Sequence, residues 1–211
     1  MRVKIAAGNW KMNTHAASRT ALAAGLVAAV GGLQRPQVLL FPPFPYLPAI
    51  AGAVAGSRIQ LGAQNCHCEA KGAFTGEVSP AMLRDVGCQW VLIGHSERRH
   101  LFGETDDFLK KKVLAALAAG LKVVFCVGEK LDQRQAGKTQ AVVETQLREG
   151  ILGLAPETWD NVVIAYEPVW AIGTGVNATP DQAEEVHAFI RSWLARQVSD
   201  ATASATRILY G

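Results

Sequence analysis

The feature that most limits the fold of this chain is a series of seven short apolar runs, separated by longer stretches with the composition of helices. The runs span residues 4–9, 37–41, 59–64, 90–94, 121–127, 162–167 and 207–210. Most are continuous, without the polar alternation of a half-exposed strand. Strands buried on both faces of a parallel sheet have this pattern.

Helices are predicted at residues 15–30, 45–55, 80–86, 106–119, 136–152 and 180–197. Proline at positions 80 and 180 marks two helix starts, and glycine at positions 120 and 153 marks two helix ends. The alternation of strand and helix predicts an α/β protein with right-handed crossovers.

Two arrangements of such strands compete, an open doubly wound sheet and a (β/α) barrel. A doubly wound nucleotide-binding sheet would carry G-x-G-x-x-G after its first strand, but residues 8–13 read GNWKMN. A phosphate-binding P-loop ending at residues 137–139 fails as well, because Asp132 stands where its first glycine should be. The sequence therefore favours the barrel, and 211 residues fit one domain, residues 1–211.

The composition excludes several classes of protein. With 49% hydrophobic and 18% charged residues, the chain is too apolar to be disordered and too low in charge for a coiled coil. Its net charge of +3 contains no long basic run, so we expect no nucleic-acid partner. The apolar stretches at 5–8 and 21–33 are too short for a secretory signal and a membrane span, respectively. We therefore expect a cytoplasmic protein with no membrane partner.

The four cysteines, at positions 66, 68, 88 and 126, are too few for a secreted disulfide scaffold. Cys66-His67-Cys68 resembles part of a metal site, but no second C-x-x-C or H-x-x-x-H spacing follows it. We expect reduced, partly buried thiols and no metal.

In a parallel α/β barrel the active site lies at the carboxyl ends of the strands, so polar residues directly after the apolar runs are the candidates. Asn9 and Lys11 follow the first run, and the period of two in a strand predicts that both point inward. His95 follows the fourth run, and Glu167 closes the sixth. Together, a lysine, a histidine and a glutamate from three strands are more specific than any one of them.

Each candidate also has a purely structural interpretation. Lys11 is compatible with a solvated loop lysine, although its place beside Asn9 favours a charge for an anionic substrate. His95 fits a core histidine, but on a strand-to-helix turn its ring would accept backbone N–H groups and stay neutral. Glu167 fits a surface glutamate, yet it closes a buried run and is better placed to act as a base.

The segment after Glu167, residues 168–178, is longer than the 2–6 residues usual for a βα loop. It is apolar at its centre and predicts a lid that excludes water, containing Pro168, Trp170 and Gly175. The glycines at positions 173 and 175 would let backbone N–H groups approach a phosphate.

Five motifs together resemble the triosephosphate isomerase family. They are NWKMN at 9–13, GAFTGE at 72–77, IGHSERR at 93–99, CVGE at 126–129 and AYEPVWAIGTG at 165–175. They occur in family order and at family-like spacing. The resemblance implies a (β/α)8 TIM barrel, of which this chain would contain about seven strands.

The resemblance also implies a reaction. Dihydroxyacetone phosphate and glyceraldehyde 3-phosphate would interconvert through an enediol(ate), without a cofactor, in glycolysis and gluconeogenesis. Glu167 is implied as the base, and His95 as the neutral electrophile. Lys11 and Asn9 would stabilise the developing oxyanion and hold the substrate, and the N–H of Gly173 would bind its phosphate.

Further residues take supporting roles by the same resemblance. Glu97 is implied to contact Lys11, and Cys126 is implied to lie near the site. Phe74 and Thr75 are implied to reach a second copy of the chain in a homodimer.

The chain departs from the family pattern in two places. Val176 stands where the family usually has lysine, so we expect altered hinge behaviour in the lid. The chain also stops after the seventh run, at Gly211, and so lacks much of the family's phosphate site. We expect the natural protein to extend about 35–45 residues further, to the roughly 250 residues of a complete barrel.

Two other interpretations stay open at this point. A Schiff-base aldolase would need a desolvated lysine deep in the barrel, whereas the sixth strand ends in Glu167; borohydride trapping with substrate tests this. An inactive truncated barrel, or a structural fragment, is the second alternative, and a coupled activity assay separates it from an isomerase.

Overall fold

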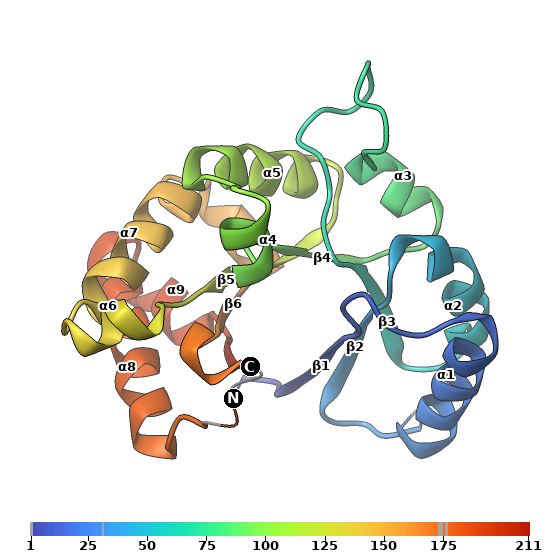
Figure 1. Cartoon of the computed structure of the whole chain (residues 1–211), viewed down its shortest axis with the longest axis horizontal. Helices are drawn as coiled ribbons and strands as arrows, with labels where there is room; N and C mark the ends of the chain where they lie inside the picture. The colour runs from blue at the N-terminus through green and yellow to red at the C-terminus, as the bar shows by residue number, and fades with distance from the viewer. Residues whose placement is uncertain (1, 31, 173–174, 176) are drawn as a thin grey trace. The chain divides into compact units, whose positions relative to one another are not determined.

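The computed structural model describes residues 2–30, 32–172, 175 and 177–211. Within this part of the chain, seven strands follow one another in the sheet in chain order, and the pairs β1–β2, β2–β3, β3–β4 and β6–β7 are parallel (Figure 1). The strands are β1 (Ile5–Asn9), β2 (Gln37–Phe41), β3 (Ile59–Ala63), β4 (Trp90–Ile93), β5 (Lys122–Val127), β6 (Val162–Tyr166) and β7 (Ile208–Tyr210). Each lies within a predicted run, and the parallel order confirms the predicted α/β barrel class.

Helices lie between the strands, as the sequence predicted. The α-helices are α1 (Ala16–Val30), α2 (Leu47–Val54), α3 (Pro80–Asp85), α4 (Ser96–Leu101), α5 (Asp106–Ala118), α6 (Leu131–Gln135), α7 (Thr139–Ile151), α8 (Pro180–Gln197) and α9 (Asp200–Ala205). Short 3-10 helices are η1 (Phe44–Tyr46), η2 (Pro156–Asn161) and η3 (Val169–Ala171).

The structure corrects the helix predictions in two ways. Helices α4, α6 and α9 were not predicted, because five or six residues are too few to show a helical period. The helix predicted from position 136 begins at Thr139, because Gly137 has a φ of 66° and separates α6 from α7. The helix predicted from position 45 begins at Leu47, after the 3-10 turn η1.

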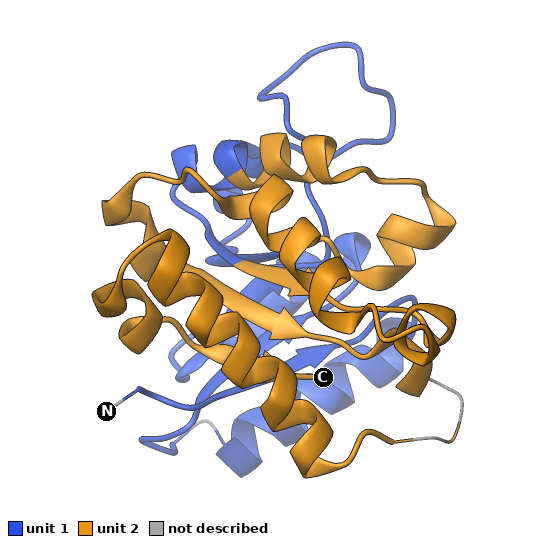
Figure 2. Ribbon diagram, turned by 90° about the vertical axis from the view of Figure 1, so that its left-hand side faces the viewer, with its two compact units in different colours: residues 1–93, 114–123 blue, residues 94–113, 124–211 orange. Residues whose placement is uncertain are grey.

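Two compact units divide the chain (Figure 2). Unit 1 contains residues 1–93 and 114–123, with strands β1 to β4. Unit 2 contains residues 94–113 and 124–211, with most of β5 and with β6 and β7.

The core of unit 1 is built on the continuous apolar strands. Leu39 and Phe41 on β2 are fully buried, as is Trp90 on β4. The indole of Trp90 donates to Oε1 of Gln60 at 2.7 Å, which satisfies its one polar atom. Gly62 on β3 leaves room for the ring of Phe41, because a Cβ there would lie 2.3 Å from Cε1.

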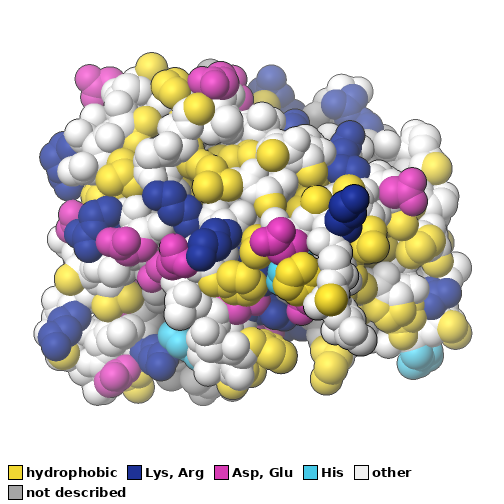
Figure 3. Space-filling model, turned by 90° about the horizontal axis from the view of Figure 1, so that it is seen from above, with side chains coloured by type: hydrophobic (Ala, Val, Ile, Leu, Met, Phe, Trp, Pro, Cys, Tyr) yellow, Lys and Arg dark blue, Asp and Glu magenta, His cyan; other side chains and the backbone are white. Residues whose placement is uncertain are grey.

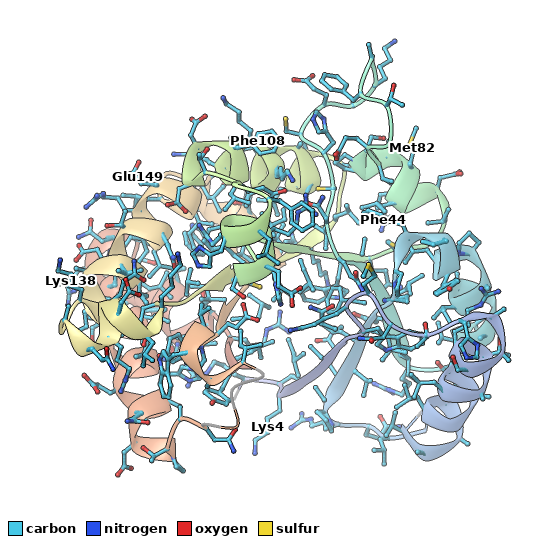
Figure 4. The ribbon with its side chains drawn as sticks, viewed as in Figure 1. Lys4, Phe44, Met82, Phe108, Lys138 and Glu149 are labelled. Atoms are coloured by element: carbon cyan, nitrogen blue, oxygen red, sulfur yellow. The ribbon has the colours of Figure 1, made fainter. Side chains whose placement is uncertain are left out.

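The core of unit 2 forms between strands β5 and β6 and the inner faces of α7 and α8. On α7 the buried residues recur at helical spacing, and they are Val143, Gln146, Leu147, Gly150 and Ile151. Lys138 and Glu149 point away from the strands, on the outer side of this unit (Figure 4). Gly150 packs on the ring of Phe125 of β5. Gln146 is the one polar member of this otherwise apolar face.

The described residues give four findings on membrane spans, surface charge, cysteines and metal-ligating groups. No described helix is long and apolar enough to cross a membrane. Side chains of both charges are interspersed on the face shown in Figure 3. All four cysteines are free thiols, and the described residues hold no group of three or more metal-ligating side chains.

We predict that Gly150→Ala lowers the free energy of unfolding by about 1–3 kcal/mol, because a buried ring must move to admit the methyl. The new Cβ would lie 2.2 Å from Cζ of Phe125. Gly25→Ala is the control. Gly25 lies within α1, and a Cβ added there would have no neighbouring atom within 4 Å. Helix propensity should make that variant more stable by up to about 1 kcal/mol. Urea denaturation measures both, and equal effects would contradict the packing argument.

Candidate active site

His95 and Glu167, which the sequence placed after two different strands, lie within hydrogen-bond distance in unit 2. His95 occupies the N-cap position of α4, and its Nδ1 accepts the N–H of Glu97 at 3.2 Å. An Nδ1 that accepts a backbone N–H carries no proton, so the proton of the neutral ring is on Nε2. That Nε2 lies 2.9 Å from Oε1 of Glu167.

Two donors stabilise the charge of Glu167. Besides His95, the N–H of Ser96 donates to its Oε2 at 3.1 Å. The side chain is 12% exposed, and this burial alone would raise the carboxyl pKa. The hydrogen bonds from His95 and Ser96, together with the electrostatic attraction of the His95 ring, outweigh burial and lower the pKa below its ordinary value of 4.5. Their stabilising effect on the fold is therefore present above pH 4.5 and is lost as the pH falls through the folded-state pKa.

Arg99 ties the turn before His95 to the end of β5. Its guanidinium donates to the carbonyl of Gly94 at 2.6 Å and to that of Cys126 at 3.2 Å. Asp106 pairs with the same guanidinium. Gly94 has a φ of 82°, and a Cβ there would lie 2.9 Å from the carbonyl oxygen of Cys126. The turn that presents His95 therefore requires glycine at this position.

Asn9 and Lys11 lie close together in unit 1, but only Asn9 is a strand residue. Strand β1 ends at Asn9, whose Oδ1 accepts the N–H of Lys11 at 3.0 Å. Lys11 has a φ of 51°, in the left-handed region. The prediction that the strand period sets the direction of the side chain is therefore wrong for Lys11. The local side-chain hydrogen bond bends the backbone, so the period of two stops at Asn9.

The bend at Lys11 is held from β3. The amide of Gln64, which follows β3, donates to the carbonyls of Lys11 at 2.9 Å and Phe41 at 2.8 Å. Asn13 donates to the carbonyl of Trp10 at 2.8 Å, and Trp10 is buried. These bonds balance the cost of a lysine in the left-handed region.

The segment that carries Phe74 and Thr75 is a long loop between β3 and α3, which extends from unit 1 in Figure 2. The ring of Phe74 lies 4.3 Å from that of His67, and its side chain remains 43% exposed. Thr75 is exposed. The loop thus presents a partly exposed aromatic ring to its surroundings.

Comparison with known proteins agrees with the five motifs. The family model of triosephosphate isomerase matches residues 4–211. The triosephosphate isomerase of Rhodopirellula baltica is 54% identical over 205 residues, covering 97% of this chain and 81% of its own length. That of Chloroflexus aurantiacus is 50% identical over 211 residues, covering 100% of this chain and 84% of its own. The chain belongs to the triosephosphate isomerase family.

In this triosephosphate isomerase family member, Glu129 holds the first residues of the predicted lid. Glu129 is fully buried, and its carboxylate accepts the hydroxyl of Tyr166 at 3.1 Å and the indole N–H of Trp170 at 2.9 Å. Arg134 pairs with it at 3.2 Å and lies over the ring of Trp170. The N–H of Val169 donates to the carbonyl of Glu129 at 3.1 Å. Burial and the charge of Glu129 raise the pKa of Tyr166, so its phenol stays protonated and donates.

Cys126 is buried, and its thiol interacts with the charge of Glu167. Burial, and then the charge of Glu167, raise the pKa of its thiol far above the ordinary value. A thiol that stays protonated is a poor nucleophile.

The structure does not test the roles predicted for several positions. Gly173 and Val176 lie outside the described residues. Pro168 and Trp170 are buried, and Gly175 is exposed with a φ of 77°. The contact of Glu97 with Lys11, and the contacts of Phe74 and Thr75 with a second copy, stay predictions.

Sequence reasoning missed four residues that bond to Glu167 or to the segments next to it. They are Ser96, Arg99, Glu129 and Gln146. The first three lie inside the quoted motifs, so their identity was visible but their partners were not. The signal for Gln146 is weaker, a single polar residue on a helix face that is otherwise apolar.

We predict that Trp170→Phe lowers the free energy of unfolding by about 1–3 kcal/mol more than Trp159→Phe does. The first change removes a donor from the buried carboxylate of Glu129. Trp159 is 5% exposed, and its Nε1 has no hydrogen-bond partner among the described residues, so the same change there removes no bond. Urea denaturation gives both values. Similar losses in the two variants would argue against the stabilising role of the indole of Trp170.

Proposed function

We propose that this protein interconverts dihydroxyacetone phosphate and glyceraldehyde 3-phosphate by proton transfer, with Glu167 as the base. The observation that carries the proposal is the 2.9 Å contact between Oε1 of Glu167 and the protonated Nε2 of His95. An ionised carboxylate beside a neutral imidazole that donates is the pair that such a proton transfer needs. Membership of the triosephosphate isomerase family supports the isomerase reaction.

In the proposed mechanism the carboxylate of Glu167 takes a proton from the carbon next to the substrate carbonyl. The electrons of that C–H bond form the C=C bond of an enediolate, and negative charge develops on the former carbonyl oxygen. The Nε2–H of His95 donates to this oxygen and shuttles protons between the two oxygens. Glu167 then returns its proton to the neighbouring carbon, which completes the exchange of ketone and aldehyde.

The remaining predicted residues bind the substrate or support this chemistry. We assign the charge of Lys11, beside Asn9, to the anionic substrate and the developing oxyanion. The N–H of Gly173 is proposed to bind the phosphate, within a lid that also contains Pro168, Trp170 and Gly175. Closure of this lid would exclude water from the enediolate. Glu97 and Cys126 are supporting residues, and no cofactor takes part.

We also propose that the protein is a homodimer. The exposed ring of Phe74, on a loop that extends from unit 1, supports this assignment together with the family resemblance. In the dimer, Phe74 and Thr75 would lie beside Asn9 and Lys11 of the second copy. A cytoplasmic location, a role in glycolysis and gluconeogenesis, and the lack of nucleic-acid and membrane partners remain predictions from the sequence.

For the reaction, we predict that Glu167→Gln lowers kcat by about 100- to 10,000-fold, because glutamine keeps the shape of the side chain but cannot take a proton. Binding of glycerol 3-phosphate, which lacks the reactive carbonyl, should change little. A coupled assay and isothermal titration calorimetry measure the two effects. In the unmodified protein, the lowered pKa of Glu167 places the acid limb of the kcat/KM profile, which reports the free enzyme, below pH 4.5.

The contrasting variant is Lys11→Ala, which should weaken glycerol 3-phosphate binding as well as kcat/KM, since its charge meets the anion before and during reaction. Equal losses of binding and turnover in Glu167→Gln would contradict the role of Glu167 as the base. Normal binding in Lys11→Ala would contradict the proposed role of that lysine.

For the assembly, we predict that Phe74→Asp converts the dimer into a monomer, because a charge replaces the apolar contact. Light scattering after size-exclusion chromatography should show twice the chain mass of 22.5 kDa before the change and the chain mass after it. Leu131→Asp is the control, since Leu131 on α6 is 51% exposed and lies outside this loop. An unmodified protein that runs as a monomer would refute the dimer.

A further inference from the structure

Gln146 is a polar residue in a place where the fold otherwise uses apolar ones. It lies on the inner face of α7 and is 7% exposed, between the fully buried Val143 and Leu147. A buried carboxamide is costly unless both of its ends are hydrogen-bonded. Its presence on this face therefore calls for specific partners.

Both ends of the Gln146 amide bond to the backbone of one residue, Gly128. The N–H of Gly128 donates to Oε1 at 2.8 Å, and Nε2 donates to the carbonyl of Gly128 at 3.1 Å. Gly128 directly follows β5, where its two neighbours, Val127 and Glu129, use their carbonyls for the N–H groups of Glu167 and Val169. The N–H and C=O groups of successive residues point to opposite sides of an extended chain, so those of Gly128 point away from Glu167 and Val169. Gln146 supplies the pairing that a neighbouring strand would otherwise give.

Gly128 is also in direct contact with the backbone of Glu167. A Cβ at Gly128 would lie 1.8 Å from the carbonyl oxygen of Glu167 and 2.8 Å from its carbonyl carbon. The N–H of Glu167 is held by the carbonyl of Val127 at 2.8 Å. The backbone from which the Glu167 side chain extends is thus held against residues 127–128. Gln146 in turn fixes Gly128 through hydrogen bonds to its N–H and C=O groups.

We propose that Gln146 is a positioning residue: by clamping the Gly128 peptide, it sets where the Glu167 carboxylate stands relative to Nε2 of His95 and N–H of Ser96. This inference rests on the proposed function for its effect on catalysis. Its structural content, the placement of the carboxylate between two donors, is independent of that function. Small displacements of a base cost much in rate, because proton transfer needs aligned partners.

The test compares Gln146→Met with Val143→Ala. Methionine has nearly the length of glutamine but cannot bond Gly128, so the peptide loses its clamp. Val143→Ala removes buried packing from the same face of the same helix and leaves the clamp intact. Chemical denaturation shows how far each variant is destabilised, which separates general loosening of α7 from loss of the clamp. If Gln146→Met does not fold, Gln146→Asn replaces it, since its shorter amide reaches Gly128 less well.

We expect kcat to fall by about 10- to 100-fold in Gln146→Met with KM within about threefold, and to stay within about twofold in Val143→Ala. The second readout is the pH titration of the Glu167 carboxyl by 13C NMR, with its signal identified by its absence in Glu167→Gln. His95 and His100 lie near this carboxyl, and their titrations are followed in the same spectra. The midpoint should rise in Gln146→Met, because the donors to the carboxylate fit less well, and should stay unchanged in Val143→Ala.

Equal changes in the two variants, or an unchanged kcat and midpoint in Gln146→Met, would overturn the proposal. A lack of isomerase activity in the unmodified protein would refute the proposed function instead. In that case the NMR titration alone decides the role of Gln146. A higher midpoint in Gln146→Met then upholds it, and an unchanged midpoint rejects it.

Discussion

A largely buried carboxylate that must stay ionised is the constraint on which the arrangement around Glu167 depends. Removal from water favours the neutral acid, which is too weak a base for the role proposed for Glu167. The Nε2–H of His95 and the N–H of Ser96 offset that cost and lower the pKa instead. Because Nδ1 of His95 accepts a backbone N–H, the histidine can supply its hydrogen bond while remaining neutral. The start of one helix, α4, therefore holds both partners, through the N–H groups of Ser96 and Glu97.

The end of β5 serves as the common support for these groups. The carbonyl of Cys126 accepts Arg99, which holds the turn before His95, and the carbonyl of Val127 accepts the N–H of Glu167. Gly128 contacts the backbone of Glu167 and is clamped by Gln146. Four consecutive residues, 126–129, thus hold the histidine, the glutamate and the first turn of the lid. This explains why the short CVGE motif matters although it supplies no atom to the proposed chemistry.

Much of this site was predictable, and what was missed shares one cause. His95 and Glu167 were found because polar residues directly after buried strands are conspicuous. Their mutual distance was not, because it depends on how two strands and a helix turn pack. For Lys11 the sequence prediction was wrong. It extended the strand period past Asn9, where a side-chain hydrogen bond bends the backbone. The hydrogen bonds of Gln146 join it to Gly128, 18 positions away, and no local sequence pattern predicts such a pair.

The sequence by itself determined the strands, the longer helices and the family, since apolar continuity, helix-start and helix-end residues and contiguous motifs are local properties of the chain. The tertiary structure alone decided which donors reach Glu167, how Glu129 collects Tyr166, Trp170 and Arg134, and which peptide Gln146 clamps. Hydrogen bonds act over about 3 Å and depend on direction, so their partners are set only when distant segments have packed. Burial, and with it the pKa of Glu167, is likewise a property of the folded surroundings and not of the glutamate itself.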